Sequence, residues 1–131
     1  MKISALAFIA LFTITGLVSC KKDHDSPKVS SGIQGHWEGT YKSSASGNTF
    51  FYAFNIKAGG VIEEVNSSGE VLGTGTWQID NNILSAHYAW PSGTDFSVLA
   101  AYYPQNNKLL GDWGYDNSAT DGGTWEMSKT N

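Results

Sequence analysis

Hydrophobic and polar residues alternate in short runs along most of the chain after residue 34. Alternation with a period of two is typical of β-strands that bury one face, because successive strand side chains point to opposite sides. No window of this region holds an apolar period of 3.6 residues long enough for a helix. The predicted strands are rich in Val, Ile, Thr and aromatic residues and span residues 35–43, 49–57, 61–66, 70–79, 83–90, 94–103, 108–115 and 123–129.

Clusters of Gly, Asn, Asp, Ser and Pro separate these runs, and such clusters favour turns. The predicted turns lie at residues 44–48, 58–60, 66–69, 80–82, 91–93, 104–107 and 116–122. Short links make each strand antiparallel to the one before it, so the strands form a meander. Because closing the sheet removes its two exposed edges, the sequence predicts an all-β domain that is an eight-stranded antiparallel up-and-down β-barrel. A two-sheet sandwich is the alternative.

A Gly-x-Trp motif recurs four times in the predicted strands. The four copies are Gly35-His36-Trp37, Gly75-Thr76-Trp77, Gly111-Asp112-Trp113 and Gly123-Thr124-Trp125. Residues two apart in a strand share a face, so each glycine lies on the side of its tryptophan. Four tryptophans exposed to water would be unfavourable. We therefore expect all four indoles to point inward, with the first and last strands adjacent. Each glycine is expected to make room for an indole of a neighbouring strand and to let its own strand coil sharply.

The first residues match an export signal. Lys2 is followed by a mainly apolar run over residues 3–18, which is shorter than the roughly 20 residues that a bilayer-spanning helix needs. Leu17-Val18-Ser19-Cys20 resembles the lipobox of bacterial lipoproteins, in which the cysteine is lipidated before cleavage. The sequence thus predicts a signal peptide over residues 1–19 and lipidation of Cys20. Since Cys20 is the only cysteine, the chain cannot form an internal disulfide.

Residues 20–34 are predicted to be the lipidated cysteine and a flexible linker, because they are polar and lack a hydrophobic period. The Ser-Cys-Lys-Lys-Asp start resembles lipoproteins of the Bacteroidetes, in which charges after the cysteine can direct display on the cell surface. We expect lipid anchoring at the outer membrane, on its periplasmic face or at the surface; the same charges would also solvate a linker. His24 lies between Asp23 and Asp25, but a segment without fixed geometry predicts no metal site.

The charge of the chain limits the classes of partner that the predicted domain, residues 35–131, can bind. The chain has a net charge of −4 and contains no arginine, and half of its eight lysines precede residue 35. Nucleic-acid binding relies on clustered Lys and Arg, so the sequence disfavours it. The domain also lacks the guanidinium fork that commonly holds carboxylate or phosphate ligands.

The opening Gly35-His36-Trp37 and the Thr74-Gly75-Thr76-Trp77 strand resemble the calycin superfamily, the lipocalins and avidins. With the anchor and the terminal Gly-Gly-Thr-Trp strand, the chain is similar to short lipocalin-like lipoproteins of the Bacteroidetes. The resemblance implies an eight-stranded barrel and a basic side chain over the first tryptophan, a place that only Lys129 can take. A C-terminal helix pattern is missing, and residues 37–41 lack the polar set with which avidins hold biotin, so biotin binding is not implied.

An eight-stranded barrel encloses either its own side chains or one small ligand. The sequence predicts a non-enzymatic lipoprotein that binds a small apolar or aromatic molecule at the barrel mouth, without cofactor or metal, with residues 90–94 and 116–122 at the rim. The candidate ligand contacts are Trp37, Trp77, Trp90, Trp113 and Trp125. The alternative is a surface protein-interaction or inhibitor module whose barrel interior is filled.

The sequence does not determine which faces of the second, fifth and sixth predicted strands point into the barrel. Tyr88 shares a face with Trp90, and Tyr102 shares one with Phe96 and Val98, so a shift of one residue decides whether these rings line the interior. The second strand is apolar on both faces. An exposed Phe51 would belong to a patch suited to a protein partner or a second copy, unless a neighbouring loop covers it.

The sequence contains no recognisable set of catalytic residues. His36 and His87 are the only histidines of the domain, and no Ser-His-Asp, metal-spaced His or Gly-rich phosphate motif accompanies them. We therefore expect a non-enzyme; an enzyme remains a third possibility, which would lose activity on His87→Ala. Residues 116–121 depart from the EF-hand spacing and predict a polar turn.

Glu63 and Glu64 are neighbours on one predicted strand and point to opposite faces, which excludes an acid–base pair. Glu63 lies between Val61 and Val65. Its carboxylate is expected either inside the barrel or, as is commoner, at the solvated rim.

Overall fold

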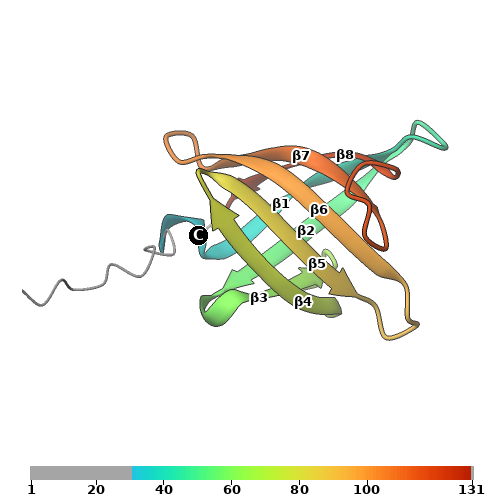
Figure 1. The fold of residues 1–131 in the computed structure, drawn as a ribbon, viewed down its shortest axis with the longest axis horizontal. Coiled ribbons are helices and arrows are strands. Elements are labelled where there is room, and N and C mark those ends of the chain that lie inside the picture. The colour runs from blue at the N-terminus through green and yellow to red at the C-terminus, as the bar shows by residue number, and fades with distance from the viewer. Residues whose placement is uncertain (1–30, 131) are drawn as a thin grey trace, which may run out of the picture.

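The computed structural model describes residues 31–130 (Figure 1). The predicted signal peptide, Cys20 and the linker up to residue 30 lie outside the described residues. The elements are η1 (Ser31–Ile33), β1 (Gly35–Ser43), β2 (Thr49–Lys57), η2 (Ala58–Gly60), β3 (Val61–Val65), β4 (Val71–Asp80), β5 (Ile83–Ala89), β6 (Asp95–Tyr103), β7 (Lys108–Tyr115) and β8 (Gly123–Lys129).

The eight strands form a closed barrel in chain order, and every neighbouring pair is antiparallel. β1 pairs with β8, with Trp37 opposite Lys129 and Ser43 opposite Gly123. The predicted all-β class, the up-and-down barrel and the adjacency of the first and last strands are confirmed, and the sandwich is excluded. Predicted and observed strand ends differ by no more than one residue, for example at β3 and β4.

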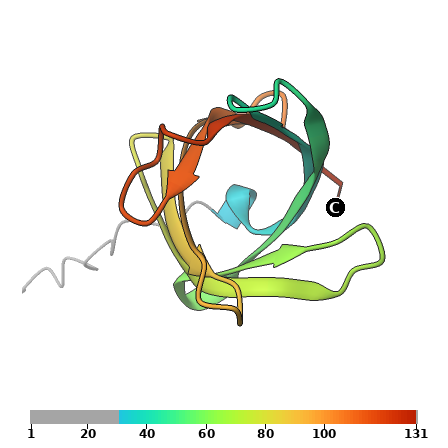
Figure 2. The ribbon, with the colours of Figure 1, turned by 90° about the vertical axis from the view of Figure 1, so that its right-hand side faces the viewer.

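The up-and-down order gives the barrel two different ends. One end, here called the open end, carries the loops 44–48, 66–70, 90–94 and 116–122. The other, the closed end, carries η1, the short links 58–60, 81–82 and 104–107, and the end of β8. Figure 2 looks into the open end, and η1 is seen across the far end of the barrel.

The turn η1 is packed onto the closed end. Ile33 is fully buried, and the Trp37 indole N–H donates to its carbonyl oxygen at 2.8 Å. The resemblance implied that the Lys129 side chain packs over the Trp37 indole. Lys129 pairs with Trp37 across β8 and β1, but its Nζ donates to the Gly32 carbonyl oxygen at 2.9 Å and no cation–π contact between the pair is found. Residues 31–33 were assigned to the linker from the sequence, yet they belong to the packed domain.

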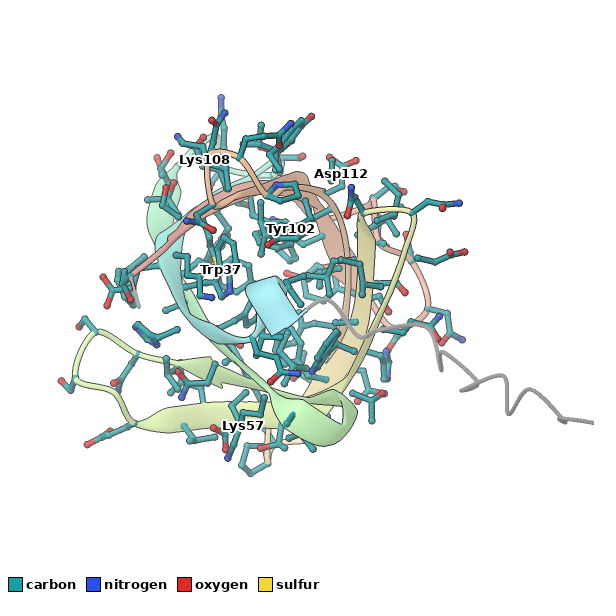
Figure 3. All side chains as sticks on the ribbon, turned by 90° about the vertical axis from the view of Figure 1, so that its left-hand side faces the viewer. Trp37, Lys57, Tyr102, Lys108 and Asp112 are labelled. Atoms are coloured by element: carbon teal, nitrogen blue, oxygen red, sulfur yellow. The ribbon has the colours of Figure 1, made fainter. Side chains whose placement is uncertain are left out.

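All four tryptophans of the Gly-x-Trp motifs are buried, as expected from the alternation. Trp37 meets Tyr102 edge to face with ring centroids 6.0 Å apart. In Figure 3, these two side chains lie inside the ring of strands, while Lys57 and Lys108 lie outside it. The register of β5 and β6 is also settled, because the buried residues of these strands are Leu84, Ala86, Tyr88, Phe96, Val98, Ala100 and Tyr102.

The motif glycines lie where neighbouring strands approach each other closely. A Cβ atom at Gly75 or Gly111 would overlap the backbone carbonyl of His87 or Leu99 on the neighbouring strand, rather than an indole. At Gly123 the closest atom is again a carbonyl oxygen, that of Lys42. At Gly75 and Gly111 the prediction of room for an indole is therefore wrong: these glycines allow neighbouring backbones to approach closely, which fits the predicted sharp coiling of the strands. At Gly123 the Trp113 indole nitrogen also lies 3.1 Å from the Cβ position, so the glycine there makes room for both a backbone and an indole.

Strand β2 presents aromatic residues to both sides, as the sequence indicated. Phe51 is 42% exposed on the outer face, whereas Tyr52 and Phe54 are buried in the interior. Phe50, at the open end, stacks on Tyr41 with ring centroids 5.2 Å apart. Between residues 31 and 130, the structure has no helix that is long and apolar enough to span a bilayer.

Candidate functional site

The barrel interior is filled at the closed end and hollow at the open end. The hollow is a cavity of about 280 Å³. Seven of the nine residues that line it are aromatic; the full set is Tyr41, Tyr52, Glu64, Tyr88, Trp90, Thr94, Phe96, Trp113 and Tyr115. The sequence left open whether the barrel interior is a cavity or is filled. In the structure, one half of the interior is filled and the other half contains a cavity.

Strand alternation and pairing bring the aromatic rings together. Tyr41 follows the buried Trp37 by four residues on β1, so both point inward. Tyr88 of β5 pairs with Phe96 of β6, which pairs with Tyr115 of β7. Their rings pack in sequence, with centroids 5.2 Å and 5.7 Å apart. The result is a continuous aromatic wall on one side of the cavity.

Further rings close the wall towards the mouth. Trp90 lies against Phe96 with centroids 4.8 Å apart, and Trp113 lies 5.4 Å from Tyr115. Tyr41 meets Trp113 at 5.3 Å with an interplanar angle of 78°. The rings are thus inclined to each other and present both faces and edges to the cavity.

The inward carboxylate is Glu64, not Glu63. Glu64 is 6% exposed, whereas Glu63 lies on the outer side near Lys57. Glu64 lies on the inward face because it follows the fully buried Ile62 by two residues on β3. A β-bulge comes after it, since the pairing of β3 with β4 shifts between Glu64 and Val65. Because of this shift, Val65 is buried like Glu64. Strict alternation would instead have placed Val65 on the outer face together with Glu63.

Glu64 is joined to the cavity wall by a hydrogen bond. The Trp90 indole N–H donates to Glu64 Oε2 at 2.7 Å. Burial raises the pKa of the Glu64 carboxyl group, although hydrogen bonding from Trp90 and Tyr88 acts in the opposite direction. Nearby, the Tyr52 and Tyr88 hydroxyl groups are 2.6 Å apart, and burial raises the pKa of both phenols. Both tyrosines are therefore neutral hydrogen-bonding groups at physiological pH.

The raised pKa of Glu64 predicts that Glu64→Gln stabilises the protein at pH 7. The folded state binds this proton at a higher pH than the unfolded state, so the ionised carboxylate destabilises the fold above its folded pKa. As the pH falls through that pKa towards the unfolded value of 4.5, the native protein regains this stability. Thermal unfolding should show a higher Tm for the variant at pH 7 and a smaller difference at pH 4.

Comparing the Tm of Glu64→Gln with that of the native protein at each pH cancels the contributions of all other titratable groups. His36, for example, is present in both; desolvation lowers its pKa, but the hydrogen bonds to Asn55 and Glu38 together with the negative charge of Glu38 raise it overall. Glutamine keeps an oxygen that accepts the Trp90 N–H, so the packing is preserved. A difference in Tm that stays the same from pH 7 to pH 4 would contradict the effect of burial on Glu64.

The five tryptophans proposed from the sequence separate into two groups. Trp90 and Trp113 line the cavity. Trp37, Trp77 and Trp125 are buried away from its lining, and their indole N–H groups donate to the carbonyl oxygens of Ile33, Lys57 and Asp112. Only the first two are placed to contact a ligand in the cavity, although Trp90 is still 38% exposed at the mouth.

Among the other residues of the cavity, the sequence left the direction of Tyr88 and Phe96 open and did not single out Tyr41, Tyr52 or Tyr115. Tyr41 could have been found, since it continues the inward face of Trp37 and Gly39 on β1. Tyr52 could not, because β2 has aromatic residues on both faces. The rim residue Thr94 and both candidate rim loops do lie at the open end, as expected.

On the outer face, the fold brings His87 close to Ser97 and Asp95. His87 Nδ1 lies 3.0 Å from Ser97 Oγ, and Nε2 lies 3.8 Å from Asp95 Oδ2. The Ser97 hydroxyl donates its proton to the Asp116 carbonyl oxygen, so the imidazole serves as donor to Ser97. A serine nucleophile needs the reverse arrangement, in which the hydroxyl donates to histidine. The contact therefore links β5, β6 and the 116–122 loop without forming a catalytic triad.

The loop 116–122 is organised by its own side chains. Asp121 Oδ1 accepts the backbone N–H of Tyr115 at 2.8 Å, and the Gly122 N–H donates to the Trp113 carbonyl oxygen at 2.9 Å. Within residues 31–130, no three His, Cys, Asp or Glu side chains are grouped as a metal site would require.

A search with protein-family models and a search of curated proteins both give no match to the chain.

Proposed function

We propose that this protein is a lipid-anchored binding protein of the outer membrane that holds a small aromatic or apolar molecule in the open end of its barrel. The observation that carries the proposal is the cavity of about 280 Å³ with seven aromatic residues among its nine lining residues. Aromatic rings with a few polar groups are the usual lining of sites for small organic ligands. The volume lies at the lower limit of such sites, so it suits one compact molecule.

The two halves of the interior support this function. At the closed end, η1 and the buried Trp37 leave the barrel filled, which gives a rigid base. At the open end, Tyr52 and Tyr88 are held by their mutual hydrogen bond and by aromatic packing. A cavity whose walls are already ordered needs little further ordering of side chains on binding, and this favours affinity.

The place where the linker joins the barrel also suits an anchored binding protein. The predicted lipid on Cys20 would stabilise membrane attachment through its two acyl chains. The chain enters the domain at η1, which lies at the closed end, opposite the mouth of the cavity (Figures 1 and 2). An anchor at that end leaves the mouth free to exchange ligand.

Thr94→Phe tests the binding role of the cavity. Thr94 lines the cavity at its mouth, and a phenyl ring there would occupy part of the space. We expect the variant to bind small aromatic compounds at least about tenfold more weakly, which corresponds to a loss of roughly 1.4 kcal/mol. Tryptophan fluorescence of the full-length protein, titrated with a panel of such compounds, measures the change because Trp90 and Trp113 line the cavity.

The matched control is Thr124→Phe, which places the same ring on an exposed position of the outer face of β8. This variant should bind like the native protein. If native protein and both variants fail to bind any compound of the panel, small-molecule binding is excluded and the protein-interaction alternative becomes the better explanation. If Thr94→Phe and Thr124→Phe weaken binding equally, the ligand does not occupy the cavity.

A further inference from the structure

We infer that the cavity selects a compact organic cation: an ammonium group carried on a small apolar or aromatic body. The inference rests on the proposed function and narrows it, since it assigns a charge to the ligand. Three features support it, namely a buried carboxylate, the arrangement of the aromatic rings around it, and the distribution of charge between the two ends of the barrel.

The first feature is the carboxylate inside an otherwise uncharged cavity. Of the nine residues that line it, Glu64 alone has a charged side chain. A carboxylate can accept about four hydrogen bonds; the Trp90 indole N–H takes one of them at Oε2, and the Tyr88 hydroxyl takes another. Acceptor capacity thus remains for a ligand. A buried carboxylate is costly when it has no countercharge, and a bound ammonium group would supply one.

The second feature is the set of rings around this carboxylate. The face of an aromatic ring carries negative potential and attracts cations, most strongly for tryptophan. Trp90 donates its N–H to Glu64 and lies at the cavity mouth, and Trp113 and Tyr41 are nearly perpendicular to each other. Rings at several inclinations around one carboxylate can contact the alkyl groups and the charge of an ammonium ion from different sides. A neutral ligand would use the rings but not the carboxylate.

The third feature is the charge at the two ends of the barrel. The loops of the open end contain Glu70, Asp116 and Asp121, and they contain no lysine. Three of the four lysines of residues 31–130 lie at the closed end, on β2, β7 and β8, and two of them are labelled on the outside of the barrel in Figure 3. The fourth, Lys42, lies near the open end of β1 and does not line the cavity. Negative charge around a mouth raises the local concentration of cations and speeds their entry. An anionic ligand would meet no cationic partner in the cavity lining.

Glu64 also has a structural contact, since it fixes the Trp90 indole. Glutamine at position 64 separates that contact from the charge, because its side-chain oxygen still accepts the indole N–H while the negative charge is lost. Glu63 provides a matched control. It is the neighbouring carboxylate on the outer side of the same strand, and it does not line the cavity.

The experiment compares three probes that share a phenyl group and differ in charge: 2-phenylethylamine, 2-phenylethanol and phenylacetate. Their binding to the full-length protein is measured at pH 7 by calorimetry. We expect the amine to bind at least about tenfold tighter than the alcohol, and phenylacetate to bind most weakly. Glu64→Gln should lower the ratio of amine to alcohol affinity about tenfold, whereas Glu63→Gln should leave this ratio unchanged.

The outcomes distinguish the cation preference from the proposed function itself. Equal affinity for amine and alcohol in the native protein, or an equal fall of the ratio in both Gln variants, would overturn the preference for cations while leaving a small-molecule site intact. Absence of binding for all three probes and for the neutral aromatic panel would overturn both. Residual binding of the alcohol by Glu64→Gln shows that the variant retains its cavity, so loss of the amine preference cannot be attributed to unfolding.

Discussion

Replacing Trp37 with alanine is expected to lower the free energy of unfolding by about 4 kcal/mol, because a fully buried indole is lost from a packed interior. The void would lie at the closed end, where Trp37 contacts Tyr102 edge to face. The change also removes the N–H that satisfies the Ile33 carbonyl oxygen. A buried carbonyl without a partner adds to the destabilisation.

This loss is large relative to the whole stability of a small domain, which is typically about 5–15 kcal/mol. Urea unfolding followed by fluorescence at several emission wavelengths measures the difference. Phe51→Ala is the matched control, since it removes an aromatic ring that is 42% exposed on the outer face. We expect a change within about 0.5 kcal/mol for that variant. A Trp37→Ala protein as stable as Phe51→Ala would mean that η1 and Trp37 do not close the barrel end as described.

Replacing Gly75 with alanine is expected to destabilise the protein by about 3 kcal/mol although it adds a single methyl group. The added Cβ would overlap the His87 carbonyl oxygen and approach the Tyr88 Cα, both on β5. Rotation of a side chain cannot relieve a clash with backbone atoms, so β4 and β5 would have to move apart. Tyr88 lines the cavity, and its position would change with them.

Thr74→Ala, at the exposed position next to Gly75 on β4, provides the control. It makes no such overlap and should cost less than about 1 kcal/mol, as expected for a change of strand propensity alone. Thermal and urea unfolding of both variants give the comparison. Equal stability of Gly75→Ala and the native protein would show that the barrel wall can spread at this point without loss of free energy.

Much of the fold could be predicted from local features. Alternation defined the eight strands, and clusters of turn residues defined the seven links, because both depend on residues close together in sequence. The inward direction of Trp37, Trp77, Trp113 and Trp125 followed from the same alternation, and burial bears it out. Barrel closure followed from the exposed edges that an open meander would leave.

Features that depend on pairing between strands were not predictable in this way. The glycines of the Gly-x-Trp motifs were expected to make room for indoles, whereas at Gly75 and Gly111 they allow a neighbouring backbone to approach. How closely two strands approach depends on the coiling of the whole barrel, and no single motif contains that information. For the same reason, the place of η1 at the closed end could not be deduced from the polar sequence around it.

The pair Glu63 and Glu64 shows most clearly the difference between features set by local sequence and features set by strand pairing. The sequence by itself determined that Glu63 and Glu64 point to opposite faces, since the alternation of a strand is local. Only the tertiary structure decided which of them is inside, because the shift in pairing between β3 and β4 removes Val65 as a guide to the buried face. The barrel and its aromatic character are thus set by residue pattern, whereas the charge inside the cavity is set by strand register, which arises only when the strands pair.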